Sequence, residues 1–417
     1  MGIKILHTGD WHLGQKFYDY DRTPEHRAFL DWLINYIKVE NVDVLLIAGD
    51  IFDVANPSSL AQRLFYNFLY EVTQCVKGLQ IILIAGNHDS AARLEAPSIL
   101  MEVFNITIVG SIKRKPDDNS IDWSSLIIPL KDKSTQNTIA YCLAVPFLRN
   151  GDFDITIEQD HSYTDAVRNF YQNLYEEVAQ INQDNLPIIA MGHLHTSNAM
   201  LSDSERGIRG GLEVVDINSF HPNIAYVALG HIHKAQKVGG FSHIRYAGSP
   251  IPMSFSEANY KHQVVDVRID GVNPIEIQSV EIPLKVELKR AGLPNQPLPK
   301  EQLFEFLNQL PELTPDLNLE DAPYLEVNVL LDGPDLLINQ EIKDALNNKY
   351  VRLARNVAYY PSVKDVEIID IQNIEELRET SPLELLQKYY QNKYDVIMPD
   401  ELTALFNEII SDLDQKD

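Results

Sequence analysis

The segment Val44–Asp50 reads Val-Leu-Leu-Ile-Ala-Gly-Asp, an apolar run that ends in glycine and is followed at once by a carboxylate. The same arrangement, with Asp, Asn or His after the glycine, recurs in Ile3–Asp10, Ile81–His88, Ile188–His193 and Tyr226–His231. Apolar runs of this length predict buried strands, and glycine at a strand end permits a sharp turn and a close approach of another group. Because ligands gather at the carboxyl ends of strands in sheet enzymes, the five runs together predict one shared metal site.

The bulk composition narrows the class of protein. The chain has 417 residues, of which 45% are hydrophobic and 23% charged, so we expect a globular protein of two or three domains. Its net charge of -25 argues against a protein that coats nucleic acid by electrostatics alone. Bound dications or a basic partner protein could still supply the positive charge that a phosphate substrate needs. No apolar run approaches the ~20 residues of a membrane span, and Cys75 and Cys142 lack metal-type spacing, so we expect a cytoplasmic protein with free thiols.

The pattern of the chain predicts three parts. Residues 1–283 alternate strand and helix patterns and then continue mostly as strands, which predicts an α/β domain. The strands are expected near 3–8, 43–48, 80–85 and 187–192, and the helices near 24–39, 58–76, 91–104 and 163–182. Residues 284–372 predict a small β-α-β-α-β domain, with helices at 300–309 and 338–347 and strands at 324–331, 350–359 and 365–371.

Residues 373–417 predict two acidic amphipathic helices. Ser381 and Glu384 fit a capping box at the start of the first helix. In the second, apolar residues recur at helical spacing over 402–413. Such helices could pack on their own domain or on a partner, and the pattern leaves both open.

The candidate metal ligands share one position, just after a strand. They are Asp10, His12, Asp50, Asn87, His193, His231 and His233. Two pairs are separated by a single residue, and in extended backbone such residues point the same way, so each pair can reach one cavity. Seven ligands exceed the need of one ion, which favours two ions that share a bridging carboxylate. The imidazoles disfavour Mg²⁺ and suit Mn²⁺, Fe²⁺ or Zn²⁺.

Two further residues are candidates for the chemistry. If Asn87 binds metal, His88 is free to face the substrate as a general acid for the leaving oxygen. The carboxylate of Asp53 could then hold the His88 imidazole in its productive tautomer. His195 is left out because the site is already full, and the basic triplet 113–115 is interpreted as a surface loop, with a DNA-facing role as the alternative.

The five motifs resemble those of the calcineurin-like metallophosphoesterase superfamily. They are Asp10–His12, Gly49–Asp53, Gly86–Asp89, Gly192–His193 and Gly230–His233, and they cover about residues 1–235. The resemblance implies a four-layer β-sandwich flanked by helices, with a dinuclear metal centre.

Longer stretches narrow the resemblance to the SbcD family, the nuclease subunits of the bacterial SbcC–SbcD DNA-repair complex. These stretches are His7–Gly14, Gly86–Ser90 with Arg93 and Leu94, Ala228–Gln236, and Arg245–Pro252 with Phe255 and Glu257. The family implies a DNA-binding capping domain where 284–372 lies, and C-terminal helices that dock on the coiled coil of an SbcC-type ATPase where 373–417 lies. It also implies a homodimer within a heterotetramer, formed through helices that correspond to about 58–76 and 91–104, with Leu64, Phe65, Phe68, Leu94 and Leu100 as candidate contacts.

The resemblance also implies roles for individual residues. One ion would be held by Asp10, His12, Asp50 and His233, and the other by Asp50, Asn87, His193 and His231, with Asp50 as the bridge and His88 as the catalytic histidine. Archaeal and eukaryotic relatives carry histidine where this chain has Asp53, whereas bacterial members usually carry aspartate. The departure therefore supports the bacterial branch.

The resulting expectation is a Mn²⁺-dependent DNA exonuclease and endonuclease, located at the nucleoid, that acts on duplex ends and hairpins with an ATPase partner. One alternative is a stand-alone metallophosphoesterase, either a phosphatase or a small-molecule phosphodiesterase. The extension beyond residue 283 and the Arg245–Pro250 segment argue against it. The other alternative is a non-catalytic binding module, which the complete ligand set and His88 disfavour.

Overall fold

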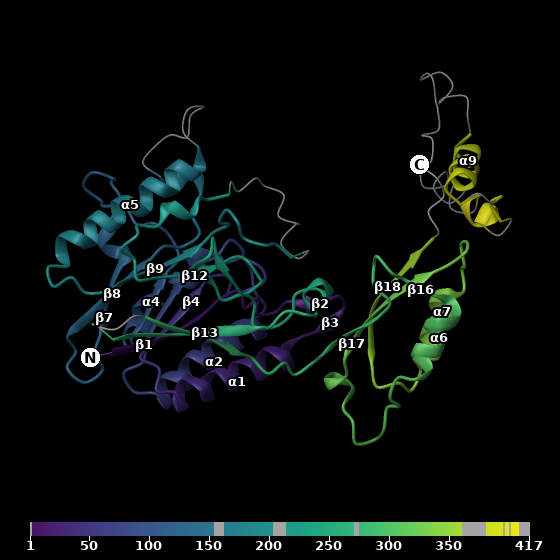
Figure 1. Cartoon of the computed structure of the whole chain (residues 1–417), viewed down its shortest axis with the longest axis horizontal. Helices are drawn as coiled ribbons and strands as arrows, with labels where there is room; N and C mark the ends of the chain where they lie inside the picture. Colours follow the sequence, from purple (N-terminus) through teal and green to yellow (C-terminus); the bar gives the residue numbers. More distant parts are fainter. Residues whose placement is uncertain are drawn as a thin grey trace. The chain divides into compact units, whose positions relative to one another are not determined.

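The computed structural model describes residues 2–153, 162–202, 214–270, 275–360, 381–394, 397–399 and 402–407. The chain forms two compact units, Met1–Glu287 and Leu288–Asp417. Figure 1 shows the sheets and helices of the first unit in purple to teal-green and those of the second in green to yellow.

The first sheet of unit 1 has six strands in the order β14-β13-β1-β4-β5-β6. Their bounds are β1 (Gly2–Thr8), β4 (Val44–Ala48), β5 (Gln80–Ile84), β6 (Ile106–Val109), β13 (Gln263–Asp270) and β14 (Glu276–Glu281). Strands β1, β4, β5 and β6 run parallel, whereas β13 pairs antiparallel with both β1 and β14. Every residue of β4 and β5 is buried, which explains why β4 and Ile81–Ile84 of β5 are unbroken apolar runs.

The second sheet also has six strands, in the order β11-β12-β10-β9-β8-β7. Their bounds are β7 (Ile127–Lys131), β8 (Thr138–Ala144), β9 (Ile188–His193), β10 (Tyr226–Gly230), β11 (Gln236–Val238) and β12 (Phe241–Tyr246). The four central strands run parallel, and the two edge strands pair antiparallel with them. The carboxyl ends of β9 and β10 therefore lie next to each other.

The two sheets pack face to face between helices. Along β4, Leu46 belongs to the core shared with the second sheet, whereas Leu45 and Ile47 belong to the core beneath the helices α1 (Thr23–Val39) and α2 (Ser59–Cys75). This alternation places the helices and the second sheet on opposite faces of the first sheet. The result is the α/β, four-layer sandwich that the sequence predicted.

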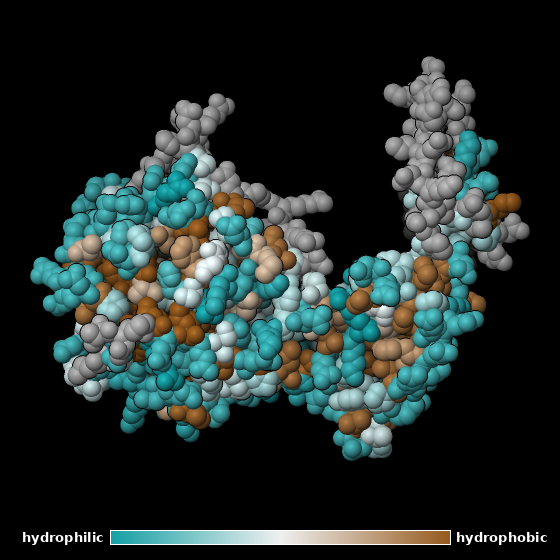
Figure 2. Space-filling model, in the orientation of Figure 1, coloured by the Kyte–Doolittle hydropathy of each residue, from teal (hydrophilic) through white to brown (hydrophobic). Residues whose placement is uncertain are grey.

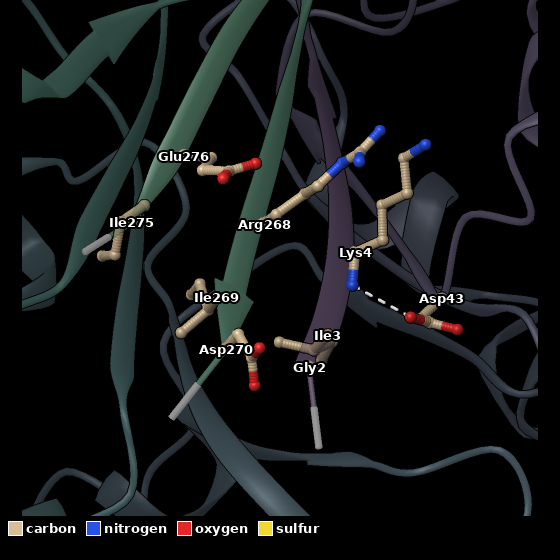
Figure 3. Close-up of a pocket in the computed structure, with 9 residues that line it drawn as sticks. All are labelled: Gly2, Ile3, Lys4, Asp43, Arg268, Ile269, Asp270, Ile275 and Glu276. Atoms are coloured by element: carbon tan, nitrogen blue, oxygen red, sulfur yellow. Dashed lines mark hydrogen bonds between the residues drawn. The ribbon is translucent and has the colours of Figure 1, made fainter. Parts of the chain in front are cut away.

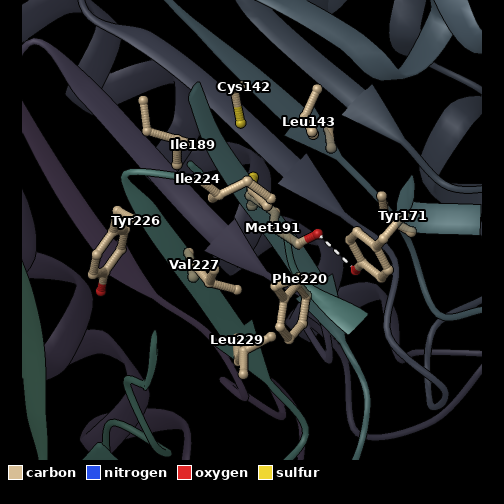
Figure 4. Packing of buried hydrophobic residues seen from close by; sticks show 14 of the residues in the cluster. Cys142, Leu143, Tyr171, Ile189, Met191, Phe220, Ile224, Tyr226, Val227 and Leu229 are labelled. Carbon is tan, nitrogen blue, oxygen red and sulfur yellow. Dashed lines mark hydrogen bonds between the residues drawn. The ribbon is translucent and has the colours of Figure 1, made fainter. Parts of the chain in front are cut away.

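The helix α5 (Tyr163–Ile181) covers the outer face of the second sheet. Figure 4 shows its Tyr171 ring beside Met191, Phe220 and Leu229, with the Tyr171 hydroxyl donating to the carbonyl of Met191 at 3.1 Å. A side chain at Gly192 would meet that hydroxyl at 2.4 Å, so the strand end admits only glycine here. The fourth layer of the sandwich is thus tied to the strand that carries His193.

One predicted helix is divided. The helix expected over 91–104 forms two short helices, α3 (Ala91–Glu95) and α4 (Ser98–Glu102), with Pro97 between them. Proline has no N–H to donate and its ring displaces the preceding turn, so the continuous helix was a wrong prediction. The remaining expected helices and strands of unit 1 lie close to their predicted bounds.

The second unit contains a small parallel sheet. Its central strand β17 (Tyr324–Leu330) pairs along its length with β18 (Arg352–Tyr359), and its other edge pairs with β15 (Leu288–Ala291) and then β16 (Leu298–Pro299). The helices α6 (Lys300–Asn308) and α7 (Ile338–Ala345) pack on this sheet. The strands β15 and β16 were not predicted, and the strand expected at 365–371 lies outside the described residues.

The C-terminal helix α9 (Pro382–Tyr394) begins at the predicted capping box. The Ser381 hydroxyl accepts the N–H of Glu384 at 3.2 Å, and the Glu384 carboxylate accepts the N–H of Ser381 at 3.2 Å. Residues 402–407 are also helical, whereas the rest of the stripe predicted over 402–413 lies outside the described residues.

Figure 2 shows a mainly hydrophilic surface over the visible face of the chain. The triplet 113–115 lies in a largely exposed turn region, as expected of a surface loop. Within the described ranges, no helix has both the length and the apolarity needed to cross a membrane.

Candidate metal centre

The predicted ligands meet where the two sheets face each other at the carboxyl ends of five strands. The loop after β1 is fastened to the loop after β4, since the N–H of Asp10 donates to Gly49 O and the N–H of His12 donates to Asp50 O, both at 3.0 Å. Strands β9 and β10 bring their ends to the same place from the second sheet. Elements that are far apart in the sequence thus deliver polar side chains to one point.

Two glycines make this convergence possible. A Cβ atom on Gly86 would lie 2.1 Å from the Asp50 carboxylate, and one on Gly230 would lie 1.8 Å from the Ala48 carbonyl. Neither position can hold a side chain, because both neighbours belong to the framework of the site. The glycines at these two strand ends are therefore needed for close approach, as the sequence indicated.

The ligand backbone departs from the expected conformation. Asp10, His12, Asp50 and His231 have φ angles of 52°, 46°, 49° and 99°. Asp10, His12 and His231 were expected in extended backbone, and that part of the prediction is wrong, because the tight turns after the strands give these residues a positive φ. Non-glycine residues with a positive φ carry strain that accumulates at functional sites.

A first ligand group comprises Asp10, His12 and His233, whose candidate ligand atoms lie within 4.8 Å of one another. One Asp10 oxygen accepts the backbone N–H of His231 at 2.8 Å. Among the described residues, neither the other Asp10 oxygen, Oδ2, nor His12 Nε2 has a hydrogen-bond partner, although both atoms are buried. Buried polar atoms are rarely left unpaired, so these two atoms fit a bound cation.

A second ligand group comprises Asp50, His193 and His231, within the same 4.8 Å limit. The Asn87 Oδ1 atom joins it, at 3.0 Å from His193 Nε2 and 2.9 Å from His231 Nδ1. Asp50 Oδ2 lies 3.3 Å from His193 Nε2 and 3.7 Å from His12 Nε2, so this carboxylate stands between the two groups. All seven predicted ligands are thus brought together.

The electrostatics of the second group favour positive charge. His193 Nδ1 donates to the Ala48 carbonyl at 2.8 Å, which leaves Nε2 facing oxygen atoms that are themselves acceptors. Burial works to lower the pKa of His193, but the carboxylates of Asp50 and Asp10 outweigh it and raise this pKa to about 9. Burial likewise works to raise the pKa of Asp50, but the neighbouring imidazoles, His193 first, hold it well below its usual range. The donor set therefore fits divalent cations.

His88 lies beside these groups and also has a ring nitrogen within 4.8 Å of ligand atoms of His12 and Asp50. Its contact with Asp53 differs from the expected one. Its backbone N–H donates to Asp50 at 2.9 Å, and its Nδ1 lies 2.7 Å from the main-chain carbonyl of Asp53, not from the carboxylate. The Asp53 carboxylate instead lies 3.4 Å from His12 Nδ1. A carbonyl only accepts, so Nδ1 of His88 carries the proton and the Nε2 lone pair is left for other partners.

Asp89 supports the site in a way that its motif did not reveal. Its buried carboxylate accepts backbone N–H groups of Ile51, Phe52 and Gly86 at distances of 2.9 to 3.1 Å. Burial, followed by the charge of Asp50, raises the pKa of Asp89 to about 6. The side chain joins the loop after β4 to the loop after β5. The only signal of this role in the sequence is the position of Asp89 directly after His88.

His195 stays outside both ligand groups. Its ring centre lies 6.5 Å from that of His231, and partial burial lowers its pKa.

A cavity of about 670 Å³ lies elsewhere, at the amino end of β1, and is lined by Lys4, Asp43 and Arg268 among others. Figure 3 shows the backbone N–H of Lys4 donating to Asp43 there, at 2.9 Å. Since Asp10 follows the opposite end of β1, this cavity is separate from the metal centre.

Comparison with known proteins agrees with this geometry. Residues 3–235 match the Calcineurin-like phosphoesterase family, and residues 297–394 match the family described as the Type 5 capsule protein repressor C-terminal domain. The first match contains all seven ligands and defines the chain as a phosphoesterase of a class that uses a dimetal centre.

Relatives along most of the chain specify the family further. The SbcD subunit of the nuclease SbcCD from Escherichia coli K12 is 35% identical over 340 residues, covering 79% of this chain and 78% of that protein. The SbcD subunit from Rhodobacter capsulatus is 37% identical over 363 residues, covering 84% and 86%, and that from Bacillus subtilis is 28% identical over the whole of both chains. The chain belongs to the SbcD family of nuclease subunits.

Proposed function

We propose that this chain hydrolyses DNA phosphodiesters with two Mn²⁺ ions, as an exonuclease and endonuclease acting on duplex ends and hairpins. The observation that carries the proposal is the pair of ligand groups with Asp50 between them and His88 at their side. A centre of two ions supplies charge stabilisation to the attacking and leaving oxygens and activates water when it is filled.

The protein residues have separate tasks in this proposal. Asp10, His12 and His233 would hold one ion, Asn87, His193 and His231 would hold the other, and Asp50, which lies between the two groups, would serve both. His88 is not assigned to a metal in this scheme and acts on the substrate through Nε2, which first takes up a proton and then gives it to the leaving oxygen. Its Nδ1 donates to the Asp53 carbonyl, which fixes the orientation of the ring.

The proposed partner is an SbcC-type ATPase in a heterotetramer that contains two copies of this chain. The relatives are named as subunits of SbcCD, and the net charge of -25 is consistent with a protein that leaves part of the DNA contact to another subunit. The candidate homodimer contacts need revision. Four of the five are buried in the core of unit 1, namely Leu64, Phe65, Phe68 and Leu94. Of the five, only Leu100, which is 68% exposed, can contact a second copy. The proposed place of action is the nucleoid in the cytoplasm.

A nuclease assay tests this function. The purified chain is incubated with hairpin and blunt-ended duplexes, with and without the ATPase, at matched concentrations of Mn²⁺ or Mg²⁺. We expect cleavage that is clearly faster with Mn²⁺, because Mg²⁺ prefers oxygen ligands and loses its water reluctantly whereas four imidazoles face this centre. Activity on a small phosphodiester but none on DNA under any of these conditions would instead favour a stand-alone phosphoesterase.

A further inference from the structure

The buried carboxylate of Glu257 lies behind one of the ligand histidines. Its Oε1 atom is 3.7 Å from Nδ1 of His233, and the residue is 0% exposed. Its two oxygens are held in place, since Oε1 accepts the hydroxyl of Ser202 at 3.1 Å and Oε2 accepts the N–H of Met253 at 2.8 Å. Glu257 lies well after the last ligand in the sequence, and no ligand motif includes it.

The chain segment that carries Glu257 is anchored on both sides. Before it, the guanidinium of the fully buried Arg22 donates to the Pro252 carbonyl, and Arg22 itself is held by two hydrogen bonds to Glu25, at 3.1 and 2.6 Å. After it, His262 Nδ1 lies 2.8 Å from the Ser249 carbonyl. Glu257 is therefore presented from a fixed backbone, as a positioning role requires.

Two other imidazoles of the centre have an acceptor behind Nδ1, whereas His231 turns its Nδ1 toward Asn87. His193 Nδ1 donates to the Ala48 carbonyl at 2.8 Å, and His12 Nδ1 lies 3.4 Å from the Asp53 carboxylate. An acceptor behind Nδ1 fixes the tautomer of a ligand histidine and leaves Nε2 for the metal. Behind His233 the facing group is the carboxylate of Glu257, at 3.7 Å from Nδ1.

We propose that Glu257 is a positioning residue of the metal centre: its carboxylate takes the Nδ1–H of His233 and directs Nε2 of that imidazole toward the ligand atoms of Asp10 and His12. The inference rests on the proposed centre of two ions. A separation of 3.7 Å is an ion-pair distance, so forming the hydrogen bond requires one of the side chains to move by about 1 Å.

Calorimetric titration of the metal-free protein with Mn²⁺ tests the inference. Wild type should bind two ions, and Glu257→Gln should weaken one of the two binding events by about 10–100-fold while the other is unchanged. Low-temperature electron paramagnetic resonance supplies a second readout, because the signal of a coupled Mn²⁺ pair should be lost at concentrations that still fill the stronger site. An unchanged isotherm for Glu257→Gln would overturn the role of Glu257.

Asp266→Asn is the matched control. Asp266 is also a buried carboxylate of unit 1, but it accepts the Tyr36 hydroxyl at 2.9 Å and faces Lys4 on a strand away from the centre. This variant should lower the melting temperature of the metal-free protein without changing either Mn²⁺ affinity. A loss of Mn²⁺ affinity equal to that of Glu257→Gln would show that any buried carboxylate has the same effect, and would sink the proposal.

A double-mutant cycle separates positioning from a general structural role. If Glu257 acts through His233, adding Glu257→Gln to His233→Ala should cause no further loss of Mn²⁺ affinity, whereas additive losses contradict the inference.

Nitrogen-15 spectra of the imidazoles in the Zn²⁺-loaded wild type give the tautomer without relying on the folding of a variant. A His233 ring bound through Nδ1 would overturn the assignment. If the wild type bound no Mn²⁺, the proposed metal centre itself would be wrong. If it bound two ions and Glu257→Gln left both affinities unchanged, only the role of Glu257 would be wrong.

Discussion

At the scale of single residues, the centre is organised by the hydrogen-bonding direction of its imidazoles. His193 and His88 each place Nδ1 against a main-chain carbonyl, of Ala48 and of Asp53 respectively. Both rings therefore turn Nε2 away from the backbone. For His193 this nitrogen faces Asn87 and Asp50, and in our proposal the Nε2 atom of His88 faces the substrate.

His88→Asn should abolish most of the cleavage and keep the metals. The asparagine amide can still donate to the Asp53 carbonyl, and the backbone N–H that bonds to Asp50 is unchanged, so the ligand groups are preserved. We expect a loss on the order of 10²–10⁴-fold in the rate, typical of a lost general acid. Rates on a phosphodiester and Mn²⁺ stoichiometry are measured together, and markedly weaker Mn²⁺ binding would contradict the assignment.

Asp50→Asn should be more damaging than His233→Ala. Asp50 lies within 3.7 Å of imidazoles from both ligand groups, and its charge favours both ions, whereas His233 belongs to one group. Metal analysis after dialysis should find both sites emptied in Asp50→Asn and mainly one in His233→Ala. Equal metal loss in the two variants would remove the bridging role.

His7 should make the stability of the metal-free protein depend on pH. Burial, with a further contribution from Arg245, lowers its pKa to about 3, although a contact with the Leu229 backbone opposes this; its Nδ1 also meets the Tyr226 hydroxyl. In the unfolded chain the pKa of this histidine is about 6.5, so the contribution of neutral His7 to the free energy of unfolding is fully present above that pH. It is lost as the pH falls, by about 2 kcal/mol at pH 5. Melting curves of wild type and His7→Gln in a chelator, from pH 7 to 5, should diverge by this amount. Parallel curves would show that His7 is not the titrating group.

The sequence was informative about which residues meet at the site and less so about how they are held. Glycine followed by Asp, Asn or His at five strand ends, with His12 and His233 two residues further on, indicated all seven residues that the structure brings together. The contact of the Asp53 carboxylate with His12 depends on the left-handed turns at His12 and Asp50, and residue type does not encode such turns. The same holds for Asp89, whose three donors come from two different loops.

At the scale of elements, the spacing of apolar residues predicted most strands and helices. It was misleading at a proline within a helical pattern and at two short polar strands. The uninterrupted runs of β4 and β5 could be predicted because both faces of these strands are buried. The stretch 91–104 has a helical period on both sides of Pro97, so its pattern concealed the break. The strands β15 and β16 are too short and too polar to stand out, and they exist because β17 offers an edge to pair with.

The helical residues 402–407 carry an element-scale prediction. Phe406 is half-buried and Leu405 is 50% exposed, so this segment has apolar surface that its own chain does not fully cover. If the segment docks on the ATPase, Phe406→Asp should abolish binding to the partner with little change in melting temperature. A pull-down and a melting curve decide the matter, with Asn407→Asp as the exposed control. A destabilised variant that still binds would show that the segment packs on its own unit, since burying a charge is costly.

At the scale of the whole molecule, the centre belongs to unit 1 alone. All seven ligands, His88 and Glu257 precede the boundary at Glu287. A chain ending at Glu287 should therefore keep Mn²⁺ binding and hydrolysis of a small phosphodiester while losing functions that need the second unit. Calorimetry and a chromogenic substrate measure the two properties. A well-folded chain 1–287 that no longer binds Mn²⁺ would mean that the second unit contributes to the centre.

The pairing of β1 with β13 has a consequence for biosynthesis. One edge of β1 is completed only by Gln263–Asp270, although β1 is the first strand to leave the ribosome. Until that segment has emerged, the nascent chain carries an unpaired edge of an otherwise buried sheet, and such edges promote association with other chains. A ribosome stalled before residue 263 should thus hold a protease-sensitive chain that needs a chaperone, whereas one stalled after unit 1 has emerged should hold a resistant one.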